Sequence, residues 1–191
     1  LQNILQVSKS EQVKEFVTKA LVGVDRLIHM VQQLLILSRL DASQEQEALT
    51  MVNLDAMLAE IIDELKSQEF MSHKNIVLSN TNKMQWNCRE TQMRILLRNL
   101  LDNACRYAEA NTQIAIIISD KTIVIRNVCA FMSEALLLQS QERFKRGSSS
   151  QQGSGLGLSI CKQICQQNNY LLSMLNREDG EEGIEVIISI P

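Results

Sequence analysis

The sequence has few aromatic residues, little net charge and no long apolar run. Phe, Trp and Tyr make up 4% of the 191 residues, so its 45% of hydrophobic residues must build a core mainly from Leu, Ile, Val and Met. A net charge of −3 argues against the basic face that non-specific nucleic-acid binding requires. No apolar run approaches the ~20 residues of a membrane span, and the beginning does not resemble a signal peptide. The composition therefore predicts a chain that is soluble as given, with one full domain and a smaller element.

The cysteines lack the spacing of a metal site, and their number is odd. The five are Cys88, Cys105, Cys129, Cys161 and Cys165. We expect them to be buried, reduced thiols of a cytoplasmic protein.

A heptad pattern dominates the first 48 residues. Apolar residues recur at alternating spacings of four and three from Val13 to Leu34, which predicts one long helix from about Glu11 to Asp41. Residues 1–7 suggest the last turns of a preceding helix. Because one helix cannot bury so wide a stripe, we expect a helical hairpin that dimerises into a four-helix bundle. Packing of the stripe against the rest of the chain is the alternative.

Residues 49–191 alternate irregularly between helical and strand patterns, after a polar linker at 44–47. The patterns predict helices at 54–72, 90–107 and 155–168, and strands at 76–79, 113–119, 122–127, 170–176 and 184–190. Helices mixed with hairpins are typical of an α+β sandwich with a mixed sheet.

The stretch NLLDNACRYA, residues 99–108, places unusual polar residues on an apolar helix. Asn99, Asn103, Arg106 and Tyr107 share one stripe of that helix. Amide oxygens suit Mg²⁺, a guanidinium suits phosphate, and a phenol can cover a base or sugar. The alternative is a polar helix edge whose asparagines cap a neighbouring loop.

Three of the seven glycines lie in GSGLGL, residues 153–158, immediately before a predicted helix. Glycines let the backbone approach a ligand closely, and a helix N-terminus favours phosphate. The polar run at 147–152 is suited to a mobile lid.

Together, NLLDNACRYA and GSGLGL resemble the ATP-binding domain of bacterial sensor histidine kinases, in the wider Bergerat-fold, Hsp90-like ATPase group. ERFKRG at 142–147, LLILSRLDAS at 34–43 and GIEVIISIP at 183–191 extend the resemblance towards quorum-sensing-type kinases. It implies an α/β sandwich with a mixed sheet (49–191), preceded by a partial dimerisation hairpin (1–48).

The resemblance also implies a nucleotide site. Asn103 would bind Mg²⁺ beside Asn99, Arg106 would reach the terminal phosphates, and Tyr107 would line the pocket. The implied ATP-binding residues are Asn99, Asn103, Arg106, Tyr107, Asn127, Arg143, Phe144, Gly153, Gly155, Leu156, Gly157 and Leu158. Hydrolytic relatives carry a glutamate at the position of Asn99, and an amide cannot replace it as a base for water.

Two features depart from the family pattern. At the adenine motif, Asn127 stands for the usual aspartate, and Cys129 and Phe131 stand for two glycines. The phosphoacceptor histidine box is missing, because neither His29 nor His73 lies in such a motif. We therefore expect a fragment that begins after that histidine and has no catalytic residue of its own, so that it cannot autophosphorylate.

The expected function is that of the cytoplasmic portion of an inner-membrane sensor kinase. It would bind ATP with Mg²⁺, and the full-length homodimer would phosphorylate a histidine and pass the phosphoryl group to a response regulator. The first alternative is a pseudokinase, a dimeric regulatory module with impaired nucleotide binding. The second, a Bergerat-fold ATPase or serine-type kinase, is disfavoured by the heptad helix and the missing glutamate.

Overall fold

A five-stranded mixed sheet forms one layer of the molecule. The computed structural model describes residues 11–42, 47–66, 68, 71, 74–79, 84–133 and 156–190. The strand order is β2-β4-β5-β7-β6, with β2 parallel to β4 and every other pair antiparallel. The strands are β2 (Asn75–Ser79), β4 (Gln113–Ile118), β5 (Thr122–Asn127), β6 (Leu171–Asn176) and β7 (Ile184–Ser189). The predicted mixed sheet is confirmed.

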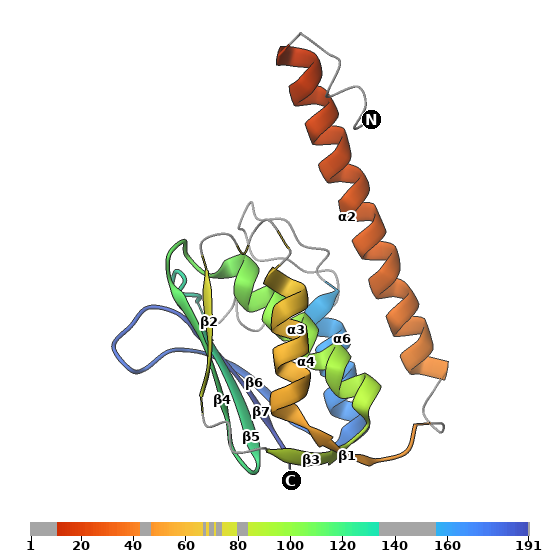
Figure 1. Ribbon diagram of the computed structural model, residues 1–191, viewed down its shortest axis with the longest axis vertical. Coiled ribbons are helices and arrows are strands. Elements are labelled where there is room, and N and C mark those ends of the chain that lie inside the picture. The colour runs from red at the N-terminus through yellow and green to blue at the C-terminus, as the bar shows by residue number, and fades with distance from the viewer. Residues whose placement is uncertain are drawn as a thin grey trace.

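Three helices cover one face of this sheet (Figure 1). They are α3 (Leu54–Lys66), α4 (Glu90–Tyr107) and α6 (Gly157–Asn168). Isoleucines alternate along the central strands, so that one set points into the core, as Ile116 and Ile125 do at 0% and 1% exposure. The core therefore lies between the sheet and the helices, and α4 occupies its centre.

A second sheet of two strands was not predicted. Strands β1 (Thr50–Asn53) and β3 (Gln85–Cys88) pair antiparallel. Each has only four residues of mixed polarity, too short for a clear alternation. Trp86 nevertheless anchors β3, because its ring is buried and its indole nitrogen donates to the carbonyl of Ser119 at 3.3 Å.

One predicted boundary was wrong, and one residue of the predicted linker contacts the second region. Helix α3 ends at Lys66 rather than near residue 72. Glu47, predicted to lie in the linker, contributes to the second region: its carboxylate accepts from the backbone nitrogen of Thr91 at 2.7 Å, in the first turn of α4. The side chain of Arg89, the N-cap residue of α4, makes no capping hydrogen bond, so Glu47 caps the helix in its place.

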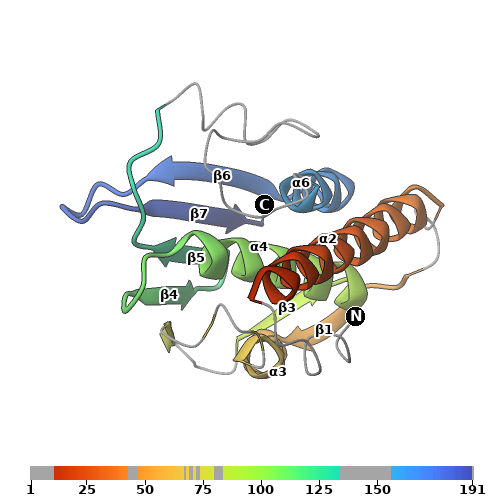
Figure 2. The same cartoon turned by 90° about the horizontal axis from the view of Figure 1, so that it is seen from above.

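The predicted long helix exists as α2 (Glu11–Ala42). One part of it packs against α6, and its N-terminal part extends past the domain (Figures 1 and 2). Most of its apolar stripe is exposed, including Phe16, Leu27 and Val31, whereas Val17, Gln33 and Leu37 are buried. Packing within the chain thus accounts for only part of the stripe. The helix expected at 1–7 lies outside the described residues.

None of the described helices is long and apolar enough to cross a membrane.

The five cysteines are buried and free, as predicted. Burial raises the pKa of the Cys88 thiol to about 11 and those of Cys105 and Cys165 to about 12. These thiols are therefore protonated core residues.

Candidate functional site

Helix α4 positions the two predicted asparagines at the edge of the core. Leu96, Leu97 and Leu100 are buried on the face of α4 that packs in the core. Asn99 and Asn103, one turn apart, are half-buried beside these leucines. The bounds of α4 are those that the sequence predicts. Its periodic leucines define the buried face, and the carboxylate of Glu47 caps the helix at the backbone nitrogen of Thr91.

The N-terminus of α6 meets α4 at these asparagines. A Cβ atom added to Gly157 would lie 3.1 Å from Asn99 Oδ1 and 3.7 Å from Asn103 Nδ2. Leu156, the residue before Gly157, is fully buried, and Leu158, the residue after it, is half-buried. The side chain of the N-cap residue, Leu156, does not cap α6, and the first N–H groups of a helix have no partner within the helix. Gly157 therefore brings an electropositive helix end against two amide side chains.

The amide of Asn99 is oriented by its neighbours. Its Nδ2 donates to the carbonyl of Ile95 at 2.9 Å, which turns Oδ1 away from its own helix. That oxygen accepts a hydrogen bond of 3.3 Å from Nε2 of Gln33, on α2. Within the described residues, the side chain of Asn103 has no hydrogen bond. Asn103 is thus the asparagine whose amide is available to a ligand.

Arg106 and Tyr107 lie at the C-terminal end of α4. Arg106 Nε is paired with Asp102 Oδ2 at 2.7 Å, which holds the guanidinium alongside the helix. Lys74 donates to the carbonyl of Cys105 close by, and its pKa is lowered, chiefly by burial. Tyr107 is 39% exposed. Two cationic side chains therefore lie near this end of α4, while Tyr107 is open to solvent.

Asn127 ends β5 and points into the core. It is 4% exposed, and its Nδ2 has no nitrogen or oxygen partner within the described residues, although its side chain lies beside the thiol of Cys129 and lowers the pKa of that thiol against the larger effect of burial. The next residue, Val128, accepts a backbone hydrogen bond from Glu109 at 2.9 Å, which joins the end of β5 to the loop after α4. A buried amide without a partner costs free energy, so this group is suited to a polar ligand.

The two substituted glycine positions differ in their surroundings. Cys129 is buried, and burial raises the pKa of its thiol. Phe131 is 70% exposed, so its ring does not fill the core. Asn176 of β6 fixes this segment, since its side chain binds the backbone nitrogen and carbonyl of Met132 at 3.0 and 2.7 Å.

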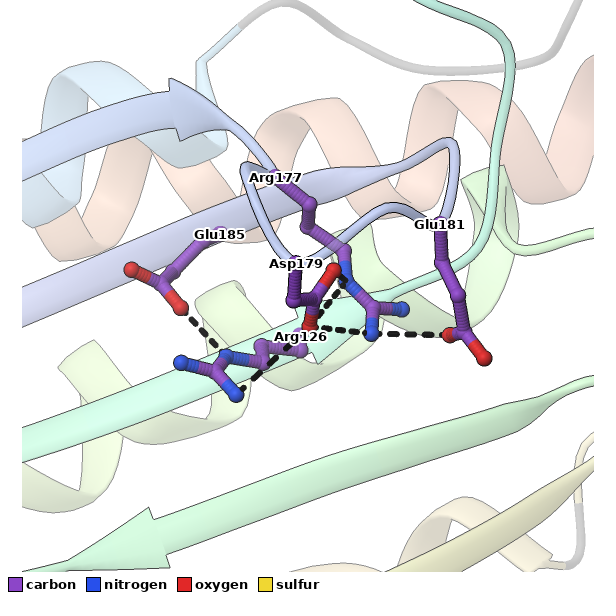
Figure 3. A network of polar contacts seen from close by, with 5 residues as sticks. All are labelled: Arg126, Arg177, Asp179, Glu181 and Glu185. Atoms are coloured by element: carbon purple, nitrogen blue, oxygen red, sulfur yellow. Dashed lines mark hydrogen bonds and ion pairs between the residues drawn. The ribbon is translucent and has the colours of Figure 1, made fainter.

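An ion-pair network on the β6–β7 hairpin lies next to the end of β5 (Figure 3). Arg177 is paired with Asp179 at 2.7 Å and with Glu181 at 2.8 Å. Arg126 of β5 is paired with Glu185 of β7 and lies 3.8 Å from Asp179. This network holds the hairpin against the strand that carries Asn127.

Sequence reasoning missed two residues of this region. A Cβ at Gly183 would lie 2.9 Å from Arg177 Cδ and within clashing distance of the carbonyl of Asn127. Gly183 stood inside the quoted GIEVIISIP stretch, yet nothing in the sequence tied it to Asn127. Gln33 looked like one polar position among many on a heptad helix.

Four predicted residues, Arg143, Phe144, Gly153 and Gly155, lie outside the described residues.

The described residues fit a phosphate-bearing ligand and a hard divalent cation. Amide oxygens are neutral, hard donors, and Mg²⁺ commonly shares its coordination shell with ligand phosphates and water. Gly157 leaves the space that a Cβ would fill between α4 and α6. Within the described part of the chain, no three His, Cys, Asp or Glu side chains gather as a metal site. The polar groups at this place are therefore the amides of Asn99 and Asn103 and the backbone at the start of α6.

Comparison with known proteins gives consistent results. A family described as "Histidine kinase-, DNA gyrase B-, and HSP90-like ATPase" matches residues 88–191. Sensor protein QseC of Salmonella typhimurium is 28% identical over 174 residues, which cover 90% of this chain and 38% of that protein. Sensor protein SrrB of Staphylococcus aureus is 27% identical over 197 residues, covering 97% of this chain and 33% of that protein. The chain thus spans 38% and 33% of the length of these two relatives.

Solved structures share the fold. The cytoplasmic segment of histidine kinase QseC has a TM-score of 0.61 at 22% identity, covering 88% of this chain and 95% of that one. Full-length ShkA in complex with AMPPNP has a TM-score of 0.73 at 18% identity, covering 98% of this chain and 41% of that one. Both likenesses concern the fold, in agreement with the architecture expected from the sequence.

Proposed function

The chain belongs to the histidine kinase-, DNA gyrase B- and HSP90-like ATPase family, and from this premise we propose that it binds ATP with Mg²⁺ between α4 and α6. The observation that carries the proposal is the convergence of Asn99, Asn103 and the N-terminus of α6 at Gly157. Asn103 holds the cation through its amide oxygen, and the first N–H groups of α6 hold phosphate. Mg²⁺, when bound, neutralises charge on the phosphates.

Asn127 supplies adenine recognition in this proposal. Its buried side-chain amide can accept from an exocyclic amino group and donate to a ring nitrogen. Arg106 and Tyr107 belong to the same site, and Asp102 positions Arg106 through the ion pair. Leu156 and Leu158 flank the phosphate-binding turn. Arg143, Phe144, Gly153 and Gly155 are assigned to the lid and hinge on the resemblance alone.

In the longer protein, we propose that this chain is the cytoplasmic part of a membrane-bound sensor kinase. Residues 49–191 would form the ATP-binding domain and residues 1–48 part of the dimerisation hairpin. The exposed apolar stripe of α2 supports dimerisation, since Phe16, Leu27 and Val31 are left uncovered. Phosphate would pass to a histidine outside this chain and then to a response regulator. An amide at position 99 suits such transfer, because it cannot activate water.

The pseudokinase alternative rests on the adenine motif. Of the two substitutions behind it, Phe131 is exposed, so only Cys129 places a buried side chain near Asn127. The alternative therefore predicts a folded protein in which Cys129 excludes adenine.

Thermal unfolding tests the proposal and its base selectivity. With Mg²⁺ and a non-hydrolysable ATP analogue at about a hundred times its Kd, we expect a rise in Tm of about 5 °C or more, because binding at that ratio adds about 2.7 kcal/mol of stability. The matching GTP analogue should give a smaller rise, since guanine presents a carbonyl oxygen where adenine presents its amino group. Equal rises would contradict recognition by Asn127, and no rise with either would contradict nucleotide binding.

A further inference from the structure

Gln33 is a polar residue on the face of α2 that packs against the domain. Its exposed fraction is 5%, and Leu37, one turn further on, is 8% exposed and belongs to the hydrophobic core. Met30 and Ile36 also pack against that core, whereas Gln32 is exposed. A buried amide in such a face must be hydrogen-bonded, and Gln33 donates one of its hydrogen bonds to Asn99.

The position of Gln33 coincides with the site described above. Its Nε2 lies 3.3 Å from Asn99 Oδ1 and 3.5 Å from the point that a Cβ on Gly157 would occupy. The side chain thus borders the space that Gly157 leaves between α4 and α6. It also uses the Asn99 oxygen that would otherwise face a ligand. A ligand that binds Asn99 through this oxygen must first displace Gln33 from it.

We propose that docked α2 is an autoinhibitory element, in which Gln33 competes with Mg²⁺ and nucleotide for the cradle formed by Asn99, Asn103 and Gly157. This proposal rests on the proposed nucleotide-binding function. The contact with Asn99 is suited to reversal, because a hydrogen bond between neutral groups adds little net stability and Gln33 must be desolvated to form it. By linkage, α2 docking weakens nucleotide binding, and bound nucleotide releases α2 by the same factor.

Nucleotide titration of Gln33→Ala tests the competition. We expect this variant of the whole chain to bind an Mg²⁺-ATP analogue about twofold to tenfold more tightly than the unmodified protein, the range that loss of one neutral hydrogen bond allows. Gln32→Ala is the matched control, since Gln32 is exposed on the same helix, and its affinity should not change. A residue with a merely structural role would not tighten binding when removed.

Hydrogen exchange gives a second readout. In the unmodified protein, a saturating Mg²⁺-ATP analogue should speed amide exchange over residues 30–37 of α2, because the helix is released. If Gln33→Ala binds with equal or lower affinity, or if exchange over 30–37 is unchanged by nucleotide, the competition is refuted while nucleotide binding stands. If no variant binds nucleotide, the proposed function fails and the competition fails with it.

Discussion

Replacing Asn103 by alanine should weaken binding of an Mg²⁺-ATP analogue by on the order of a hundredfold, about 2.7 kcal/mol. The amide of Asn103 has no other hydrogen bond within the described residues, and it lies 3.7 Å from the Cβ position of Gly157, at the start of α6. Alanine removes the only neutral oxygen donor proposed for the cation. Because Asn103 is half-buried at the edge of the core, the fold should survive the change. Calorimetric titration with and without Mg²⁺ measures the effect.

Asn87→Ala is the control for this variant. Asn87 is an exposed asparagine on β3, so its replacement should leave nucleotide affinity unchanged. The dependence on Mg²⁺ should also disappear in Asn103→Ala, so that residual binding is the same with the cation and without it. A variant that keeps its Mg²⁺ dependence would show that the cation is held elsewhere.

Replacing Gly183 by alanine should lower the free energy of unfolding by about 3 kcal/mol, at the upper end of the usual cost of overpacking. The added Cβ would meet the carbonyl of Asn127 and lie 2.9 Å from Arg177 Cδ. The side chain of Arg177 can move, but the backbone of Asn127 is fixed by its pairing with Ile184 of β7. Relief of the clash must therefore shift β5 from β7 at the proposed adenine site. Urea denaturation measures the loss.

The matched control is the same substitution at Gly23, on α2. A Cβ there would meet nothing within 4 Å. Alanine favours the helix by about 0.5–1 kcal/mol over glycine, so Gly23→Ala should leave stability unchanged or raise it. Equal stability of Gly183→Ala and the unmodified protein would show that β5 and β7 can separate at little cost.

Periodic apolar residues allowed most elements to be predicted from the sequence. Helix α4 and strand β5 have the predicted bounds, because each combines a regular buried face with clear polar flanks. The pair β1 and β3 was missed because strands of four residues barely show a period. Helix α3 was predicted too long because apolar residues continue past Lys66, although the chain leaves the helix there.

The site was predictable where its residues lie on one element. Spacing alone places Asn99 and Asn103 on one side of α4, and the glycines before α6 suggested an approach of backbone to ligand. The roles of Gln33 and Gly183 depend on contacts with residues far along the chain, Asn99 and Asn127. Such contacts are set by tertiary packing, and no local pattern encodes them.

The most direct test of the central claim is calorimetric titration of the whole chain with a non-hydrolysable ATP analogue, with Mg²⁺ and without it. The account predicts saturable binding of one nucleotide per chain that depends on Mg²⁺, since the donors at Asn103 and the N-terminus of α6 hold cation and phosphate together. Absence of binding at millimolar analogue, by a protein shown to be folded, would contradict the account and favour the pseudokinase.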